Sequence, residues 1–83
     1  MGEAARRASV PARVRYEDGD GNVYLVDVDE DNGQMWEIVK LEGMDRRERV
    51  SLGIKASFFA QAQKILDGYA LDKGFVAVEE GRR

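Results

Sequence analysis

The 83-residue chain has no cysteine and no histidine. Disulfide bonds and thiolate metal sites are therefore excluded, and the residue that most often ligates metals or acts as a general base is missing as well. No stretch approaches the about 18 consecutive apolar residues that a membrane-spanning helix needs. The first residues also lack an apolar segment of signal-peptide length, so we expect a cytoplasmic protein with no membrane partner.

Acidic residues crowd the segment 17–31, which holds seven carboxylates and no basic residue. Their spacing fits no calcium loop, because placing Gly21 at the sixth position puts Tyr16, which has no carboxylate, at the first. Neighbouring carboxylates such as Asp27 and Asp29 could divide acid and base roles, but only in a cleft that removes them from water. A charged hairpin end on a small domain is usually exposed to water. We therefore predict a protein without enzyme activity, cofactor or metal ion.

The length fits one domain and is too short for two. Residues 1–9 are small, polar and basic without periodicity, which is typical of a flexible arm. Residues 10–79 contain the periodic segments and form the predicted domain, and residues 80–83 are a charged tail. The formal net charge of −3 argues against a polycation that coats nucleic acid.

Four segments alternate between apolar and polar residues with a period of two, as half-buried strands do. They are residues 12–17, 23–29, 35–42 and 47–54. Turn residues separate them, and Asn32-Gly33 is the strongest turn signal because both residues accept the positive φ of a tight hairpin. The sequence therefore predicts a four-stranded antiparallel meander.

After Ile54 the apolar period changes to 3.6 residues, which indicates one amphipathic helix. The predicted inward residues are Phe58, Phe59, Ala62, Ile65, Leu66, Tyr69 and Ala70. The predicted outward residues are Ser57, Gln61, Gln63, Lys64 and Asp67. Ser57 is the expected N-cap and Gly74 the expected stop. The fold class is α+β, a ββββα unit in which residues 75–78 form either a short last strand or an apolar tail.

One constellation fits a binding site for single-stranded nucleic acid. It combines Trp36 with the outward arginines of the strands, which are Arg13, Arg15, Arg47 and Arg49. A tryptophan on a sheet gives bases a stacking platform, and neighbouring guanidinium groups hold phosphates. Alternatively, Trp36 belongs to the core or anchors a dimer, and the arginines pair with Glu37, Asp45 and Glu48 across strands.

The third predicted strand carries bulky side chains on both faces. Trp36 and Ile38 share one face, whereas Met35, Val39 and Leu41 share the other. One helix covers only one face of a sheet. We therefore predict a homodimer in which one of these faces meets its own copy around a two-fold axis.

The order of four meandering strands and one helix resembles the Pur-alpha repeat over residues 12–71. The residues that carry the resemblance are 23–28, 32–38 and 49–52, together with Phe59, Leu66 and Tyr69. The resemblance implies subunits that pair through sheets and helices. It also implies sheet surfaces that bind single-stranded DNA or RNA, as in the related Whirly and transcriptional-coactivator folds.

These observations leave two functions open. The first is a non-enzymatic, homodimeric nucleic-acid-binding or regulatory domain that holds single-stranded DNA or RNA on its sheet. The second is a protein-interaction module or inhibitor whose acidic segment 17–31 docks onto a basic protein partner. A continuous basic sheet face would favour the first function, and an acidic face the second.

Overall fold

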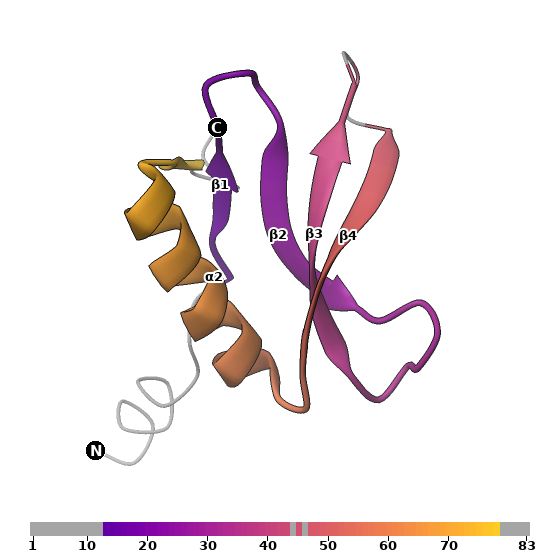
Figure 1. Cartoon of the computed structure of the whole chain (residues 1–83). Coiled ribbons are helices and arrows are strands. Elements are labelled where there is room, and N and C mark those ends of the chain that lie inside the picture. Colours follow the sequence, from indigo (N-terminus) through magenta and orange to yellow (C-terminus); the bar gives the residue numbers. More distant parts are fainter. Residues whose placement is uncertain (1–12, 44, 46, 79–83) are drawn as a thin grey trace, which may run out of the picture.

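A computed structural model of the chain describes residues 13–43, Asp45 and residues 47–78. The predicted arm and tail lie outside these ranges. The described residues form, in order, β1 (Arg15–Glu17), β2 (Val23–Val28), β3 (Trp36–Glu42), β4 (Glu48–Ala56), α2 (Phe59–Lys73) and β5 (Val76–Val78), as Figure 1 shows. The predicted ββββα arrangement is therefore confirmed, and the segment after the helix contributes a short strand.

The strands form one antiparallel sheet in the order β4, β3, β2, β1, β5. The first four strands are neighbours both in sequence and in space, which is the predicted meander. β5 adds to the outer side of β1, where Tyr16 lies opposite Ala77. Within the part of the chain that the structure describes, β4 and β5 are therefore the edge strands.

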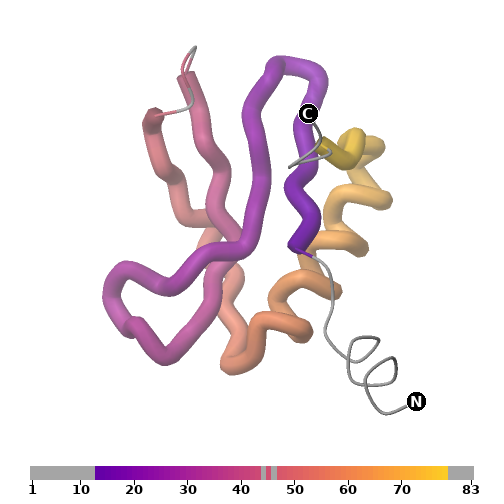
Figure 2. Tube along the Cα trace, turned by 180° about the vertical axis from the view of Figure 1, so that it is seen from behind, coloured from indigo at the N-terminus to yellow at the C-terminus, as the bar shows by residue number. Residues whose placement is uncertain are grey.

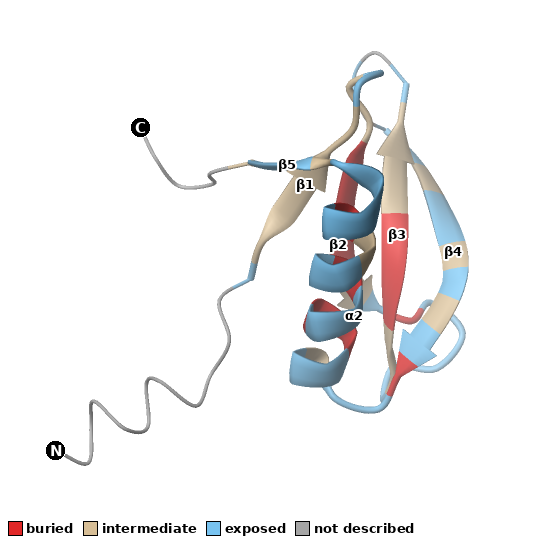
Figure 3. Ribbon diagram, turned by 60° about the vertical axis from the view of Figure 1, so that its left-hand side comes forward, coloured by how far each residue is buried: buried red, intermediate tan, exposed pale blue. Residues whose placement is uncertain are grey.

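Helix α2 packs on one face of the sheet, against β2, β3 and β4 (Figure 3). The core between helix and sheet consists of Tyr24, Val26, Ile38, Ala56, Ala62 and Leu66. None of these side chains is more than 6% exposed. Burying a large apolar side chain contributes roughly 1.5–3 kcal/mol to folding, so this layer fixes the helix on the sheet.

The other face of the sheet has its own apolar cluster. Val23, Leu25 and Val39 are buried there, and Leu41 packs against them. Successive side chains of a strand point to opposite faces, so Val39 belongs to this cluster whereas Ile38 belongs to the core under the helix. β3 therefore buries apolar side chains on both faces.

A bulge interrupts the pairing of β4 with β3. Glu37 lies opposite Lys55 and Val39 opposite Ser51, so three residues of β4, Leu52 to Ile54, face Ile38 alone. Gly53 is at the centre with φ 78°, a conformation that L side chains rarely adopt. Extruding Gly53 keeps Leu52 and Ile54 together on the helix side, where both pack against the core.

The first turn of α2 differs from the prediction. The N-cap is Phe58 rather than Ser57, its backbone is extended, and no side chain caps the helix. The Oγ atom of Ser57 lies instead 3.8 Å from Sδ of Met35. At the other end Gly74 is the C-cap with φ 79°, as predicted, because left-handed backbone favours glycine.

The predicted apolar side of α2 is correct at its centre and wrong at one border. Ala62 and Leu66 are buried as predicted. Phe58 is 71% exposed and Ile65 is 38% exposed, although both were expected to face inward. Both residues lie about 80–100° around the helix from the buried Leu66, so they point along the sheet rather than into it.

Gln63 was predicted to face outward and is buried. Its Nε2 donates to the carbonyl oxygen of Val14 at 3.1 Å, and its Oε1 accepts from the backbone N–H of Val14 at 3.4 Å. A side-chain amide that forms both bonds can be buried at little cost. Periodicity alone classifies a glutamine as polar, so the prediction failed here.

Candidate protein-interaction surface

Trp36 and Arg13 lie on the helix side of the sheet, where both contact Phe59. The Trp36 ring meets the Phe59 ring edge to face, with centroids 5.3 Å apart. The guanidinium carbon of Arg13 lies 5.6 Å from the centre of the same ring. Of the five residues predicted to bind nucleic acid, these two are brought together, with the Phe59 ring as their common contact.

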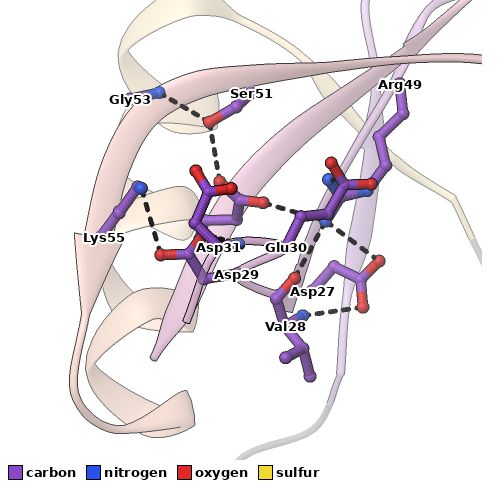
Figure 4. Close-up of polar contacts among 10 residues, drawn as sticks. Asp27, Val28, Asp29, Glu30, Asp31, Arg49, Ser51, Gly53 and Lys55 are labelled. Carbon is purple, nitrogen blue, oxygen red and sulfur yellow. Dashed lines mark hydrogen bonds and ion pairs between the residues drawn. The ribbon is translucent and has the colours of Figure 1, made fainter. Parts of the chain in front are cut away.

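Arg49 lies on the opposite face of the sheet and is surrounded by acceptors (Figure 4). Its Nη2 lies 3.0 Å from Glu37 and 3.5 Å from Asp27, and its Nη1 lies 3.1 Å from Glu30. Nη2 also donates to the carbonyl oxygen of Val28 at 3.0 Å. Burial opposes the charged form of Arg49, but the hydrogen bond to Glu37 and the other carboxylates outweigh it and raise its pKa.

The same face carries a second cation engaged by acid. Lys55 Nζ lies 3.1 Å from Asp29 Oδ2, and the Asp29 residue is only 4% exposed. The backbone N–H of Asp31 and the ammonium group of Lys55 together lower the pKa of Asp29. Ser51 Oγ donates to Glu37 at 2.8 Å (Figure 4). Arg49 and Lys55 are therefore both paired with carboxylates of the same chain.

The remaining two arginines lie apart from this cluster and from each other. Arg15 alternates along β1 with Tyr16, whose hydroxyl reaches the helix, so Arg15 points to the opposite face. Arg47 is in the connection between β3 and β4, where its Nε lies 3.1 Å from Asp45. The five predicted site residues are thus divided between both faces and a turn.

The acidic segment 17–31 is divided as well. Its two turns lie at opposite ends of β2, as Figures 1 and 2 both show. One turn contains Asp18, whose carboxylate accepts hydrogen bonds from Asn22, from the backbone N–H of Asp20 and from the Tyr24 hydroxyl. Partial burial raises the pKa of Asp18, but these bonds outweigh it and lower the pKa to about 2. The segment is therefore not one continuous acidic surface.

A different surface collects exposed apolar side chains along one side of α2. Phe58 and Ile65 are seven residues apart, about two helical turns, so they lie on the same side. Asp67 accepts a hydrogen bond from the Tyr16 hydroxyl at 2.7 Å, which ties its side of the helix to β1. At 3.6 residues per turn, Ile65 lies about 160° around the helix from Asp67. The Ile65 side therefore faces β4, on the other side of the sheet centre.

β4 contributes the second half of this surface. Val50 lies on the helix side, because it is opposite Lys40, which is itself opposite the core residue Tyr24. Figure 3 shows that α2 leaves much of β4 uncovered, and Val50 is 38% exposed. We name the combined surface the α2–β4 strip, and it consists of Val50, Leu52, Ile54, Phe58 and Ile65.

Two residues on the strip side of α2 break local helix rules. Phe58 occupies the N-cap, where Ser, Thr, Asp or Asn would bond to the first backbone N–H groups. Gly68, three residues after Ile65, lies inside the continuous helix, although a Cβ there would meet nothing within 4 Å. Glycine in a helix costs roughly 0.5–1 kcal/mol relative to alanine. The missing capping residue at position 58 and the glycine at position 68 are both visible in the sequence. Only the exposure of Phe58 in the structure shows that they flank an uncovered apolar surface.

Among the residues that the structure describes, no group of acidic side chains could hold a metal ion. No helix in the same part of the chain is long and apolar enough to cross a membrane. Comparisons of the chain with protein-family models, with curated proteins and with solved structures give no match. The resemblance to the Pur-alpha repeat therefore stays a prediction, and the function has to be argued from the geometry.

Proposed function

We propose that the chain is a non-enzymatic protein-interaction domain that docks a partner through the α2–β4 strip. The observation that carries this proposal is Phe58, an aromatic residue 71% exposed at an uncapped helix start. A capping residue there would stabilise the helix by about 1 kcal/mol, and would also remove an apolar ring from water. A residue that makes its local structure less stable than a common alternative would is typical of functional positions.

The composition of the strip supports a protein partner. Its five residues are aromatic or branched aliphatic, and none is charged. Protein interfaces have such centres, depleted of charge and enriched in aromatic residues, with polar residues around them. Exposed apolar residues that gather on one side of a molecule, as Val50, Phe58 and Ile65 do, mark interaction sites more often than single ones do.

The charges favour nucleic acid less. Arg49 pairs with three carboxylates, and Arg15 lies on the face opposite Trp36. A stacking platform for bases needs its aromatic ring and its cations on one surface. Binding of single-stranded DNA or RNA on the sheet, and docking of a basic protein through segment 17–31, are the two sequence-based alternatives to this proposal.

Photo-crosslinking from two positions on α2 tests the proposal. p-Benzoylphenylalanine replaces Phe58 in one variant and Leu71 in the other. Leu71 is a matched control, because it is 84% exposed and lies about 120° around the same helix from Ile65. After irradiation in native lysate, we expect discrete protein adducts from position 58, suppressed by excess unmodified chain, and none from position 71. Equal adducts from both positions, or none from either, would overturn the proposal.

A further inference from the structure

The occupant of the α2–β4 strip can be inferred from the strip itself, provided that the proposed function holds. We propose that a second copy of this chain docks there. The two α2 helices lie antiparallel around a two-fold axis, and Phe58 of each copy sits over Gly68 of the other. This homodimer differs from the one predicted from the sequence, which used a face of the third strand.

The shape of the strip is complementary to itself. Phe58 is a projection and Gly68 a depression, and their separation of ten positions corresponds to about 15 Å along the helix. In an antiparallel pair, the register that places Phe58 against Gly68 also places Gly68 against Phe58, so both contacts form at once. Gln61 then lies opposite Ile65 of the other copy. Docking of a different protein would not require both a projection and a depression on the same side of this helix, whereas pairing with a second copy does.

The charges at the two ends of α2 are complementary as well. The first turn has no side-chain cap and no acidic residue, so its N–H groups carry positive partial charge. Asp72 is exposed at the other end, seven residues after Ile65 and so on the same side. In this register Asp72 of each copy lies about 6 Å beyond Phe58 of its partner, in front of the uncapped N-terminal end of that helix. A parallel arrangement would place like charges together.

The area that a stable dimer needs explains the role of β4. A standard interface buries about 800 Å² per partner. This area is roughly one seventh of the 5904 Å² that the chain exposes. It is larger than the area that one side of a four-turn helix supplies. Val50, Leu52 and Ile54 lie beside the helix on the same surface and extend the contact.

Sedimentation equilibrium on the purified full chain measures the association directly. The 9.3 kDa chain is expected to give twice its mass at concentrations on the order of hundreds of micromolar. Phe58→Ser removes the projection and should weaken association by roughly 30-fold or more. The same substitution adds a helix cap, so the Tm of the dilute monomer should rise by about a few degrees. A purely structural role for Phe58 would lower the Tm instead. Leu71→Ser is the control and should leave the association unchanged.

The register is tested by disulfide trapping, because the natural chain has no cysteine to interfere. A chain with Phe58→Cys is mixed with a chain with Gly68→Cys under mild oxidation. We expect mixed 58–68 disulfides to exceed both homodisulfides, whereas a mixture of Leu71→Cys and Gly68→Cys should give no such excess. Dominant 58–58 or 68–68 disulfides would overturn the antiparallel register.

One result separates this inference from the proposed function. If the unmodified chain is a monomer at these concentrations but position 58 still crosslinks to other proteins in lysate, the second copy is excluded and the docking surface stands. If the chain is a monomer and position 58 crosslinks to nothing, both proposals fail.

Discussion

The two sides of α2 meet their surroundings in different ways. On the β1 side, polar side chains of the helix form hydrogen bonds with the β1 region. Gln63 bonds to the backbone of Val14, and Asp67 accepts a hydrogen bond from the Tyr16 hydroxyl. On the β4 side, Phe58 is exposed and has no polar group that could engage the sheet. One side of the helix therefore belongs to the fold, and the other is available to another molecule.

The difference separates two roles of the helix, which are packing on its own sheet and contact with another molecule. Hydrogen bonds between Gln63 and Val14 are directional and join residues 49 positions apart, so they fix where the helix lies on the sheet. Apolar contact is non-directional and can be made with any complementary surface. Substitutions on the β1 side should therefore change stability, and those on the β4 side should change association.

The largest expected effect is on the β1 side. Gln63→Ala should lower the free energy of unfolding by about 2–3 kcal/mol, because it leaves a cavity and removes both partners of the Val14 backbone. Gln61→Ala is the control, since this residue is exposed on the other side and its change should be within about 0.5 kcal/mol. Urea unfolding followed by Trp36 fluorescence measures both. Equal losses of unfolding free energy in the two variants would contradict the view that the β1 side of the helix contributes more to stability than the other side.

The second largest effect is expected from high pH, which should weaken the contact between Tyr16 and Asp67 on the β1 side. Burial, and then the hydrogen bond to Asp67, raise the pKa of Tyr16 from 10.0 to about 12. The neutral phenol is thus favoured in the folded state, so its stabilisation is fully present below pH 10 and is lost as the pH rises through 12. Tyr16→Phe should cost about 1 kcal/mol at neutral pH and make the decline at high pH shallower. Parallel declines in the two proteins, measured by thermal unfolding, would contradict this assignment.

A smaller and opposite effect is expected at Gly68. Gly68→Ala should raise the free energy of unfolding of the dilute chain by about 0.5–1 kcal/mol, since its Cβ meets nothing in the chain itself. The same variant places a methyl group where the partner ring is expected and should weaken association. Chemical unfolding and sedimentation are therefore expected to move in opposite directions. A variant that is less stable would show that the chain itself needs glycine there.

No effect is expected when single-stranded oligonucleotides are added at low salt. Trp36 packs edge to face on Phe59, and the predicted arginines are divided between two faces and a turn. Trp36 emission should therefore stay constant. Quenching that salt reverses and that Trp36→Ala abolishes would instead support binding of single strands on the sheet.

The order of strands and helix was predictable because it depends on short-range signals. Alternation and turn residues such as Asn32-Gly33 are read within a few residues, and each predicted strand overlaps one in the structure, although β1 begins only at Arg15 and β4 continues to Ala56. The start of the helix was one residue off, because Ser57 is a good cap by type but the backbone turns helical only after Phe58. Gln63 could not be predicted, since its bonding partner is 49 residues away.

The five candidate site residues are spread over two faces and a turn for a similar reason. Outward residues of different strands share a face only if the register between strands allows it. Trp36 lies opposite Val28 and Ala56, in a row on the helix side, whereas Arg49 lies opposite Leu41 on the other face. Alternation gives two faces for each strand, but the pairing decides which faces coincide. The strip was missed because the exposure of Phe58 depends on how the helix is rotated on the sheet, which periodicity alone does not fix.

The bulge at Gly53 also affects how β4 can pair with the strands of other chains. β4 is a nine-residue edge strand, and long, flat edges pair with other chains and extend into fibres. Deleting Leu52 and Gly53 would bring Ile54 opposite Ile38 and make the register with β3 continuous. The edge would then be a regular template for a further strand. By breaking the regular edge, the two inserted residues disfavour the growth of fibres through β4.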